Sequence, residues 1–222
     1  MLFNHGADVF ESEKERNLYY KFFAGYFFND LVSGYEKRVK SFYELLFQQG
    51  IDKEDCFGDF KLHEGMRIPS AVSVTFDFHG YLLKGAKDRG ELADILIQDH
   101  QNNLFIAIEA KSLTDWNYEK DIKVNSERIM QLKNHSRNLY QVLLLTDEKF
   151  NNCKSRKIRK NSNWGKLIKH DKNWDIPLRV ITWEDLLDIC SKNIVESDIE
   201  IKVIEFFKAL INKKREDFRI CS

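Results

Sequence analysis

The chain has 222 residues, of which 43% are hydrophobic and 13% aromatic, and it contains only 2 prolines. This length fits one large domain better than two, and the apolar content lies well outside the composition of intrinsically disordered proteins. Lys and Arg together number 35, as do Asp and Glu, so the formal net charge is zero. Taken alone, that balance argues against a dedicated nucleic-acid binder.

Neither a membrane segment nor a secretion signal is expected. The richest apolar run, Phe22 to Phe28, falls far short of the roughly 18 residues of a membrane span. Met1 to Arg16 lacks a basic region followed by an apolar stretch. The cysteines have no paired C-x-x-C spacing, which indicates neither a zinc site nor a disulfide framework. We therefore expect a cytoplasmic protein with reduced thiols and no membrane partner.

The first part of the chain is predicted to be helical and the next part to form strands. Apolar residues recur at three- and four-residue spacing over Phe10–Leu31 and Tyr35–Gln48, which predicts two helices. Period-two alternation over Val72–Phe78 predicts a half-buried strand that turns back into Tyr81–Leu83 as a hairpin.

Two covered strands and further helices follow. Near-continuous apolar character predicts central strands at Glu91–Ile97 and Leu104–Lys111, joined by a polar turn. A helix is expected over Ser126–Leu139, then strands at Gln141–Thr146 and Leu178–Thr182.

Two helices close the chain. Capping boxes that begin at Thr182 and Ser197 mark their starts, and an apolar stripe runs from Ile199 to Leu210. The pattern predicts an α/β fold of three layers, with a central mixed sheet flanked by helices and an N-terminal helical pair. We treat residues 1–222 as a single domain, with N-terminal helices in 1–50, a core in 70–187 and C-terminal helices in 188–222.

Charge is segregated along the chain. The window from Lys149 to Lys172 contains nine Lys and Arg against one acid, Asp171, which gives +8 there and −8 elsewhere. Basic side chains interleaved with asparagines can neutralise nucleic-acid phosphates, although such a run can also be a solvated loop. The candidate phosphate-binding residues are Lys154, Arg156, Lys157, Arg159 and Lys160.

The segment Glu109-Ala110-Lys111 ends a buried strand. Residues two apart on a strand project to the same face, so Glu109 and Lys111 are expected to emerge together. Five D/E-x-K triplets occur in the chain, close to the roughly four expected by chance. Only this one lies in an apolar strand, where a buried Glu and Lys cost several kcal/mol unless they are paired or bind a cation. A structural salt bridge is the alternative.

Asp94 lies inside the preceding apolar strand, fifteen positions before Glu109. If the two strands pair through the turn between them, the two carboxylates meet at one end of the sheet. Two hard oxygen ligands, with waters and a phosphate, suit Mg²⁺. The alternative is a strand-end residue that bonds to the backbone.

These residues resemble the PD-(D/E)XK nucleases, the fold of many restriction endonucleases and of defence and recombination nucleases. Ala93-Asp94 matches the "PD" element without its proline, and Glu109-Ala110-Lys111 matches the rest. Weaker likenesses extend the match from Glu15 to about Leu187.

Two of the weaker likenesses concern helices. Glu15-x-x-Leu18 followed by Phe22-Phe23 looks like the helix in which several branches carry another metal-associated glutamate, with Glu36 as the alternative. Gln131 resembles the start of the Q-x-x-x-Y element of some branches, although His135 stands where the tyrosine would be.

The resemblance implies a three-layer restriction-endonuclease-like domain that hydrolyses phosphodiesters with Mg²⁺, for which Mn²⁺ can substitute. It implies that Asp94, Glu109 and Glu15 hold the metal, that Lys111 orients the attacking water or stabilises charge, and that Gln131 addresses the site. DNA is the expected partner, ahead of RNA. A homodimer is the candidate assembly.

Restriction or phage defence is the biological setting that the resemblance suggests. A non-catalytic nucleic-acid-binding or assembly module of the same fold is the alternative. A structural or interaction protein with a coincidental motif comes third.

Overall fold

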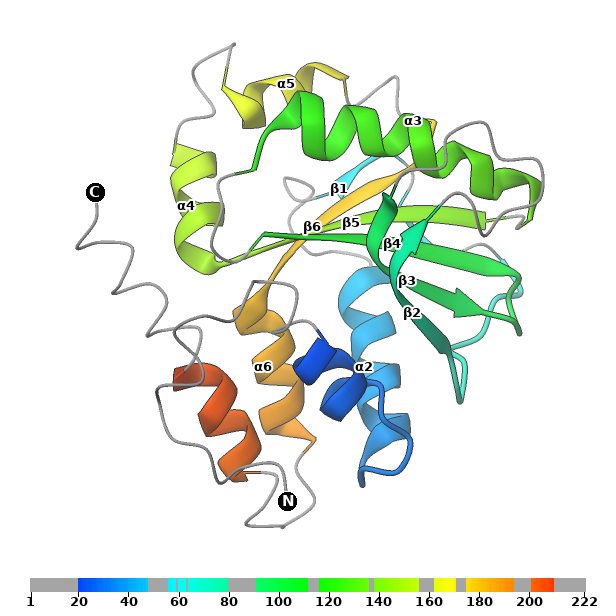
Figure 1. Ribbon diagram of the computed structural model, residues 1–222, viewed down its shortest axis with the longest axis vertical. Coiled ribbons are helices and arrows are strands. Elements are labelled where there is room, and N and C mark those ends of the chain that lie inside the picture. The colour runs from blue at the N-terminus through cyan, green and yellow to red at the C-terminus, as the bar shows by residue number, and fades with distance from the viewer. Residues whose placement is uncertain are drawn as a thin grey trace.

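A computed structural model describes most of the chain and shows one mixed β-sheet covered by helices on both faces (Figure 1). The described residues are 20–47, 56–58, 60–62, 64–79, 91–111, 116–135, 138–155, 162–170, 175–193 and 201–209.

The sheet has six strands in the order β1-β6-β5-β4-β3-β2. Strands β4, β5 and β6 run parallel, while β2 and β3 on one side and β1 on the other are antiparallel to their neighbours. The strands are β1 (Cys56–Phe57), β2 (Ser73–His79), β3 (Glu91–Asp99), β4 (Leu104–Lys111), β5 (Asn138–Leu145) and β6 (Leu178–Thr182).

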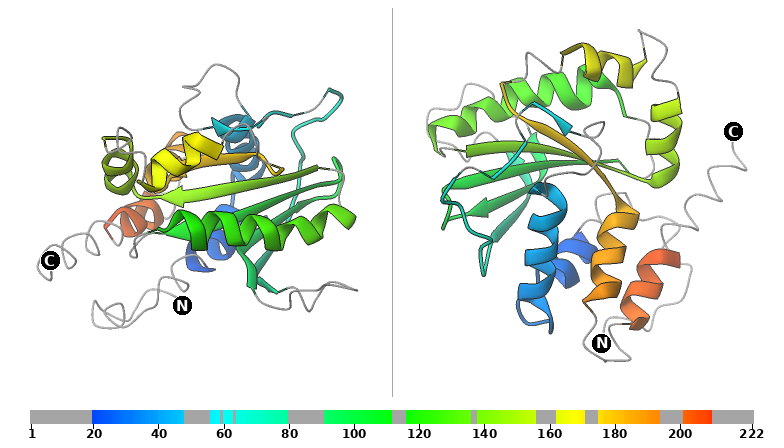
Figure 2. Two further views of the ribbon diagram at one scale, coloured as in Figure 1. Left: turned by 90° about the horizontal axis from the view of Figure 1, so that it is seen from above. Right: turned by 180° about the vertical axis from the view of Figure 1, so that it is seen from behind.

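Helices from both ends of the chain cover one face of the sheet, and helices from the middle cover the other (Figures 1 and 2). The first face carries η2 (Tyr20–Phe27), α2 (Tyr35–Phe47), α6 (Trp183–Lys192) and a helical segment at 201–209. The second carries η5 (Tyr118–Val124), α3 (Asn125–Ile129) and η6 (Met130–Asn134), which form one continuous helical run, and α5 (Asn163–His170). Helix α4 (Asp147–Ser155) lies beyond the end of β5.

The face under α2 holds the largest core cluster. Its strand side chains point from alternate positions of β3 and β4, such as Ile95 and Ile108, and its helix side chains are mostly aromatic. Phe22 packs edge-on against Trp183 with ring centroids 5.3 Å apart. Each fully buried side chain of this kind contributes roughly 1.5–3 kcal/mol, so this face anchors the fold.

The opposite face of β3 and β4 carries a smaller core that includes Leu96, Ala107 and Leu132. Because side chains alternate along a strand, Glu109 and Lys111 follow Ala107 on this same face. This face of β4 is therefore apolar as far as Ala107 and carries the charged side chains of Glu109 and Lys111 at the carboxyl end of the strand.

Several sequence predictions are confirmed. Helix α2 and strands β2, β3, β4 and β6 lie within two residues of the predicted bounds. The capping box of α6 is present: Thr182 Oγ1 accepts from Asp185 N at 3.2 Å, and Asp185 Oδ2 accepts from Thr182 N at 2.8 Å.

The helix predicted over Ser126–Leu139 is wrong at both ends, because the helical run begins at Tyr118 and ends at Asn134. Its start is set by the Asn117 side chain, which caps the first turn. Residues after the helix pair with β4 instead, since Asn138 lies beside Leu104 in parallel register. Strand β5 consequently starts three residues earlier than predicted.

The first helix also ends earlier than predicted, at Phe27 instead of Leu31. The chain turns here around the buried Arg38, whose guanidinium donates to the carbonyl oxygens of Tyr26 and Phe27, each at 3.2 Å. It also donates to the carbonyls of Ser33, Asn29 and Val32. The buried guanidinium is thus hydrogen-bonded by backbone carbonyl oxygens. Those of Tyr26 and Phe27 would otherwise accept from the backbone nitrogens of a further helical turn.

Other predictions fall partly outside the described residues. These are the start of the first helix, the hairpin return at Tyr81–Leu83 and the capping box at Ser197. The basic window contains two short helices, α4 and α5, with residues 156–161 between them outside the described part. Cys56 and Cys190 are free thiols. No helix within the described ranges is long and apolar enough to cross a membrane.

Candidate active site

Glu109 and Lys111 form an ion pair at the carboxyl end of β4. Lys111 Nζ lies 2.7 Å from Glu109 Oε1, and the two side chains are 19% and 10% exposed respectively. The prediction that Glu109 and Lys111 point to the same face of the strand is therefore confirmed. Their partial burial increases the Coulomb attraction between the two charges and also adds a desolvation cost.

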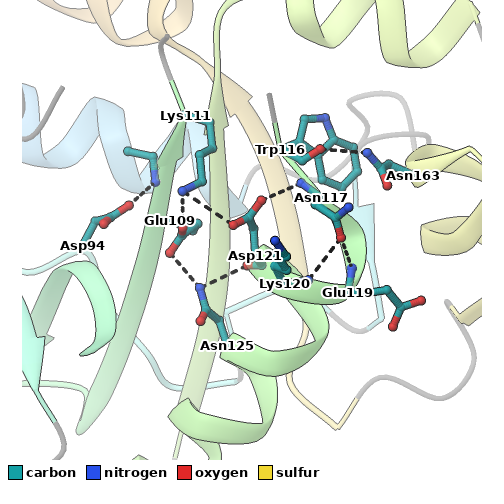
Figure 3. Close-up of polar contacts among 11 residues, drawn as sticks. Asp94, Glu109, Lys111, Trp116, Asn117, Glu119, Lys120, Asp121, Asn125 and Asn163 are labelled. Atoms are coloured by element: carbon teal, nitrogen blue, oxygen red, sulfur yellow. Dashed lines mark hydrogen bonds and ion pairs between the residues drawn. The ribbon is translucent and has the colours of Figure 1, made fainter. Parts of the chain in front are cut away.

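Asp94 reaches the same place from the neighbouring antiparallel strand. Strand β3 pairs with β4 as far as Ile95 opposite Ile108, and Asp94 is the next residue of β3 beyond this paired stretch. Asp94 Oδ2 accepts a hydrogen bond from Ala110 N at 2.8 Å (Figure 3). The sheet thus brings the two carboxylates predicted from the sequence to one end of the β3–β4 pair.

Two further side chains enter this cluster from the helical run that covers the sheet. Asn125 Nδ2 donates to Glu109 Oε2 at 2.8 Å, and Asp121 Oδ1 lies 3.6 Å from Lys111 Nζ (Figure 3). The two residues are four apart, so they share one helix face. We refer to Asp94, Glu109, Lys111, Asp121 and Asn125 as the charged cluster.

Local sequence explains why the helix presents these side chains. Asn117 Oδ1 accepts from the backbone nitrogens of Glu119 at 2.9 Å and Lys120 at 3.3 Å, which satisfies the free donors of the first turn. Asp121 Oδ2 in return accepts from Asn117 N at 2.5 Å. Asp121 therefore both closes the helix start and faces Lys111.

Helix α5 holds this helix start in place. Asn163 Nδ2 donates to Trp116 O at 2.7 Å, and Asn163 Oδ1 accepts from Tyr118 N at 3.2 Å. Lys166 Nζ lies 3.3 Å from Glu119 Oε1. The end of the basic window is thereby connected to the helix that borders the charged cluster.

The electrostatic environment of Lys111 is dominated by its acidic neighbours. Burial by itself would lower the pKa of Lys111, but the charges of Glu109, Asp121 and Asp94 outweigh burial and hold that pKa above its ordinary value. The side chain is consequently an ammonium at neutral pH. Such a group can stabilise negative charge and donate hydrogen bonds.

The donor set fits a hard divalent cation in part. Asp94 and Glu109 supply carboxylate oxygens, the ligands that Mg²⁺ prefers, and Mg²⁺ commonly keeps several waters. Within the described ranges, no three His, Cys, Asp or Glu side chains are grouped closely enough to hold a metal ion. A metal ion held by these two carboxylates would therefore take its remaining ligands from water, from a substrate phosphate, or from a residue outside those ranges.

The remaining predicted site residues are not brought to the cluster by any described contact. Gln131 lies in η6, where its Nε2 donates to Arg128 O at 3.2 Å. Glu15 lies outside the described residues, and its alternative, Glu36, is exposed in the first turn of α2. Of the basic candidates, Lys154 is in α4 but its side chain is not described; Arg156, Lys157, Arg159 and Lys160 lie outside the described part.

Asp121 and Asn125 are the functional candidates that the sequence did not predict. Asp121 begins one of the other D-x-K triplets, which composition alone accounts for, and Asn125 belongs to no motif. Recognising the Asn117 cap would have set the helix start at Tyr118 instead of Ser126, which places both residues on the helix face toward β4.

Comparisons with protein-family models, with curated proteins and with solved structures find no match for this chain.

Proposed function

We propose that the protein is a Mg²⁺-dependent nuclease that hydrolyses phosphodiester bonds, with DNA as its substrate and Mn²⁺ as an alternative ion. The observation that carries the proposal is the convergence of Asp94, Glu109 and Lys111 at one end of the sheet. Two acids and a lysine, all on rigid strands, are the groups that metal-assisted phosphodiester hydrolysis uses.

We further propose that the fold is of the restriction-endonuclease-like type. The support is the resemblance of Ala93-Asp94 and Glu109-Ala110-Lys111 to the PD-(D/E)XK motif, together with their places on adjacent strands of a mixed sheet. The carboxyl end of β4, where the cluster lies, is also where open α/β sheets commonly bind their ligands.

The roles of the residues follow from their positions. Asp94 and Glu109 would hold the metal ion. When bound, Mg²⁺ supplies polarisation of the scissile phosphate and a lower pKa for an attacking water. Lys111 would place its ammonium beside the phosphate under attack, where it would stabilise the negative charge that develops on the phosphoryl oxygens in the transition state. Glu15 is proposed as an additional acid, and Gln131 as a weaker candidate for contact with the substrate.

One observation is equally compatible with the alternative, a non-catalytic nucleic-acid-binding module of the same fold. Lys111 and Glu109 are paired at 2.7 Å, an arrangement that a structural salt bridge would also adopt. The alternative predicts nucleic-acid binding without hydrolysis, so cleavage separates the two functions.

The test is a cleavage assay of the full chain on supercoiled plasmid, linear duplex, single-stranded DNA and single-stranded RNA. Each substrate is incubated with Mg²⁺, with Mn²⁺ or with EDTA, beside the variant Glu109→Gln. We expect cleavage of at least one DNA form with either metal, none with EDTA, and loss of at least a hundredfold in the variant.

Two outcomes would contradict the proposal. Binding of DNA without cleavage under any metal condition would support the non-catalytic module. Cleavage that Glu109→Gln retains in full would show that the charged cluster is not the active site.

A further inference from the structure

The helical run η5–α3 gives the charged cluster two polar side chains that the proposed mechanism does not use. Asn125 contacts Glu109, and Asp121 contacts Lys111, at 2.8 and 3.6 Å respectively. Each side chain of the Glu109-x-Lys111 motif therefore has its own partner on the helix.

We propose that Asn125 and Asp121 are positioning residues of the site: Asn125 fixes the Glu109 carboxylate for the metal ion, and Asp121 fixes the Lys111 ammonium. This inference rests on the proposed nuclease function and names residues that act through its metal ligand and its lysine. Neither residue belongs to the motif by which the site was predicted.

Asn125 controls the orientation of the carboxylate. Glu109 Oε1 faces Lys111 and Glu109 Oε2 accepts from Asn125, so both oxygens are held and rotation of the group is restricted. The amide is itself fixed, because Asn125 Nδ2 also donates to Asp121 O at 3.2 Å. An amide is a neutral donor, so it orients Glu109 while leaving its negative charge for a cation.

Asp121 gives Lys111 a partner that is independent of Glu109. Its Oδ1 faces the ammonium, while Oδ2 accepts from Asn117 N, which ties the carboxylate to the start of the helix. That helix start is in turn held by Asn163 of α5. When the Glu109 carboxylate is engaged by a cation, Asp121 keeps Lys111 at the cluster.

Matched variants separate the two roles. Asn125→Leu keeps the side-chain size and removes the donor, and Asp121→Asn removes one negative charge with little change of shape. The control is Ser126→Ala on the same helix: Ser126 Oγ donates to buried Gln141 Oε1 at 2.6 Å, so this variant also loses a hydrogen bond between helix and sheet. Ser126 has no described contact with Glu109 or Lys111.

Each variant is measured in two ways. Mn²⁺ alone is titrated into the protein and the free ion is followed by electron paramagnetic resonance, which reports metal affinity without turnover. Steady-state cleavage of a duplex DNA then gives kcat and KM, and thermal unfolding reports the folded state.

We expect Asn125→Leu to weaken Mn²⁺ binding by about 10- to 100-fold, the usual effect of losing a partner of a metal ligand. Asp121→Asn should leave the Mn²⁺ Kd within about threefold and lower kcat roughly tenfold with little change in KM, since it acts on Lys111. Ser126→Ala should lower the melting temperature and leave metal affinity and kcat unchanged.

Several results would overturn the inference. Wild-type Mn²⁺ affinity in Asn125→Leu would remove the role of Asn125, and Asn125→Ala replaces this variant if it does not fold. Loss of Mn²⁺ binding in Asp121→Asn as complete as in Glu109→Gln would make Asp121 a ligand. If the wild type neither binds Mn²⁺ nor cleaves DNA, the proposed function fails and this inference with it; an active wild type with unaffected variants refutes the inference alone.

Discussion

The β3–β4 pair carries acidic side chains at both ends, and the two ends satisfy them in different ways. At the turn, Asp99 is only 1% exposed and its oxygens accept from Tyr43 Oη at 2.9 Å, from Asn102 N at 3.0 Å and from Asn102 Nδ2 at 2.6 Å. All three donors are neutral. Burial, followed by the Asp99 charge, raises the pKa of Tyr43 well above its usual range, so the phenol remains a donor.

At the other end, Glu109 and Asp121 lie within ion-pair distance of the Lys111 ammonium, and Asp94 accepts from Ala110 N between Glu109 and Lys111 in the chain. These four side chains sum to a charge of −2 when all are ionised, since three carboxylates oppose one ammonium. A structural carboxylate needs only donors, as Asp99 shows, whereas gathering like charges is unfavourable unless a cation or a substrate joins them. The difference supports a structural role for the turn end and a functional one for the charged cluster.

The largest expected effect is that of Lys111→Ala on cleavage. Removing the ammonium should lower kcat by about a thousandfold, or roughly 4 kcal/mol of transition-state stabilisation. DNA affinity should change little, because many phosphate contacts carry it. Steady-state cleavage measures kcat, and equilibrium DNA binding measures the affinity. Normal cleavage by this variant would identify Glu109 and Lys111 as a structural pair.

The next largest effect should come from the basic window, whose helix α5 lies on the same face of the sheet as η5. Neutralising five basic residues should weaken DNA binding on the order of 100-fold at moderate salt and lower the salt slope by up to about 4.5, at roughly 0.9 per phosphate contact. The residues are Lys154, Arg156, Lys157, Arg159 and Lys160.

The matched control neutralises five exposed lysines on the helices of the opposite face. Binding titrations at several salt concentrations compare the two sets. Equal slopes for the basic-window variant and the wild type would identify that window as a solvated segment. The control residues are Lys37, Lys40, Lys192, Lys202 and Lys208.

At the turn end, Asp99→Asn should lower the free energy of unfolding by about 2 kcal/mol, because its new amide hydrogens face groups that are already donors. Asp99 accepts from Tyr43 and Asn102, and Asn102 in turn bonds to the backbone of Arg67. Urea unfolding measures the change. A variant as stable as the wild type would contradict the structural role assigned to Asp99.

The smallest effect is expected for the same substitution at the other end. Asp94→Asn keeps an oxygen that can accept from Ala110 N and removes one of three clustered negative charges. The free energy of unfolding without metal should stay the same or rise by up to about 1 kcal/mol. A loss as large as that of Asp99→Asn would mean that the Asp94 charge serves the fold.

The sequence predicts the strands of this comparison better than the helix that covers them. Period-two patterns and continuous apolar runs identify β2, β3 and β4, because β3 and β4 are covered by a core on each face. The same alternation places Glu109 and Lys111 together. The prediction of a helix over Ser126–Leu139 is wrong at its end because Leu139 fits a helix by spacing, while pairing of β5 with β4 places Leu139 in a strand.

Partners of the motif residues could not be predicted in the same way. Asp121 and Asn125 meet Lys111 and Glu109 only because the helix start at Asn117 and the docking of α5 fix the position of the helix. The Asn117 cap is local and could have been recognised, but the Asn163 contacts join segments far apart in sequence, and no local pattern encodes them. Arg38 likewise shortens the first helix through carbonyl contacts that periodicity does not reveal.

The most direct test of the difference between the two ends is a calorimetric titration of Mn²⁺ into Asp94→Asn and Asp99→Asn, beside the wild type. Both variants carry the same chemical change on the same strand. The wild type and Asp99→Asn should bind Mn²⁺ with similar affinity, and Asp94→Asn should lose at least tenfold. Equal Mn²⁺ binding by all three proteins, or no binding by the wild type, would contradict the assignment of the charged cluster as a metal-dependent active site.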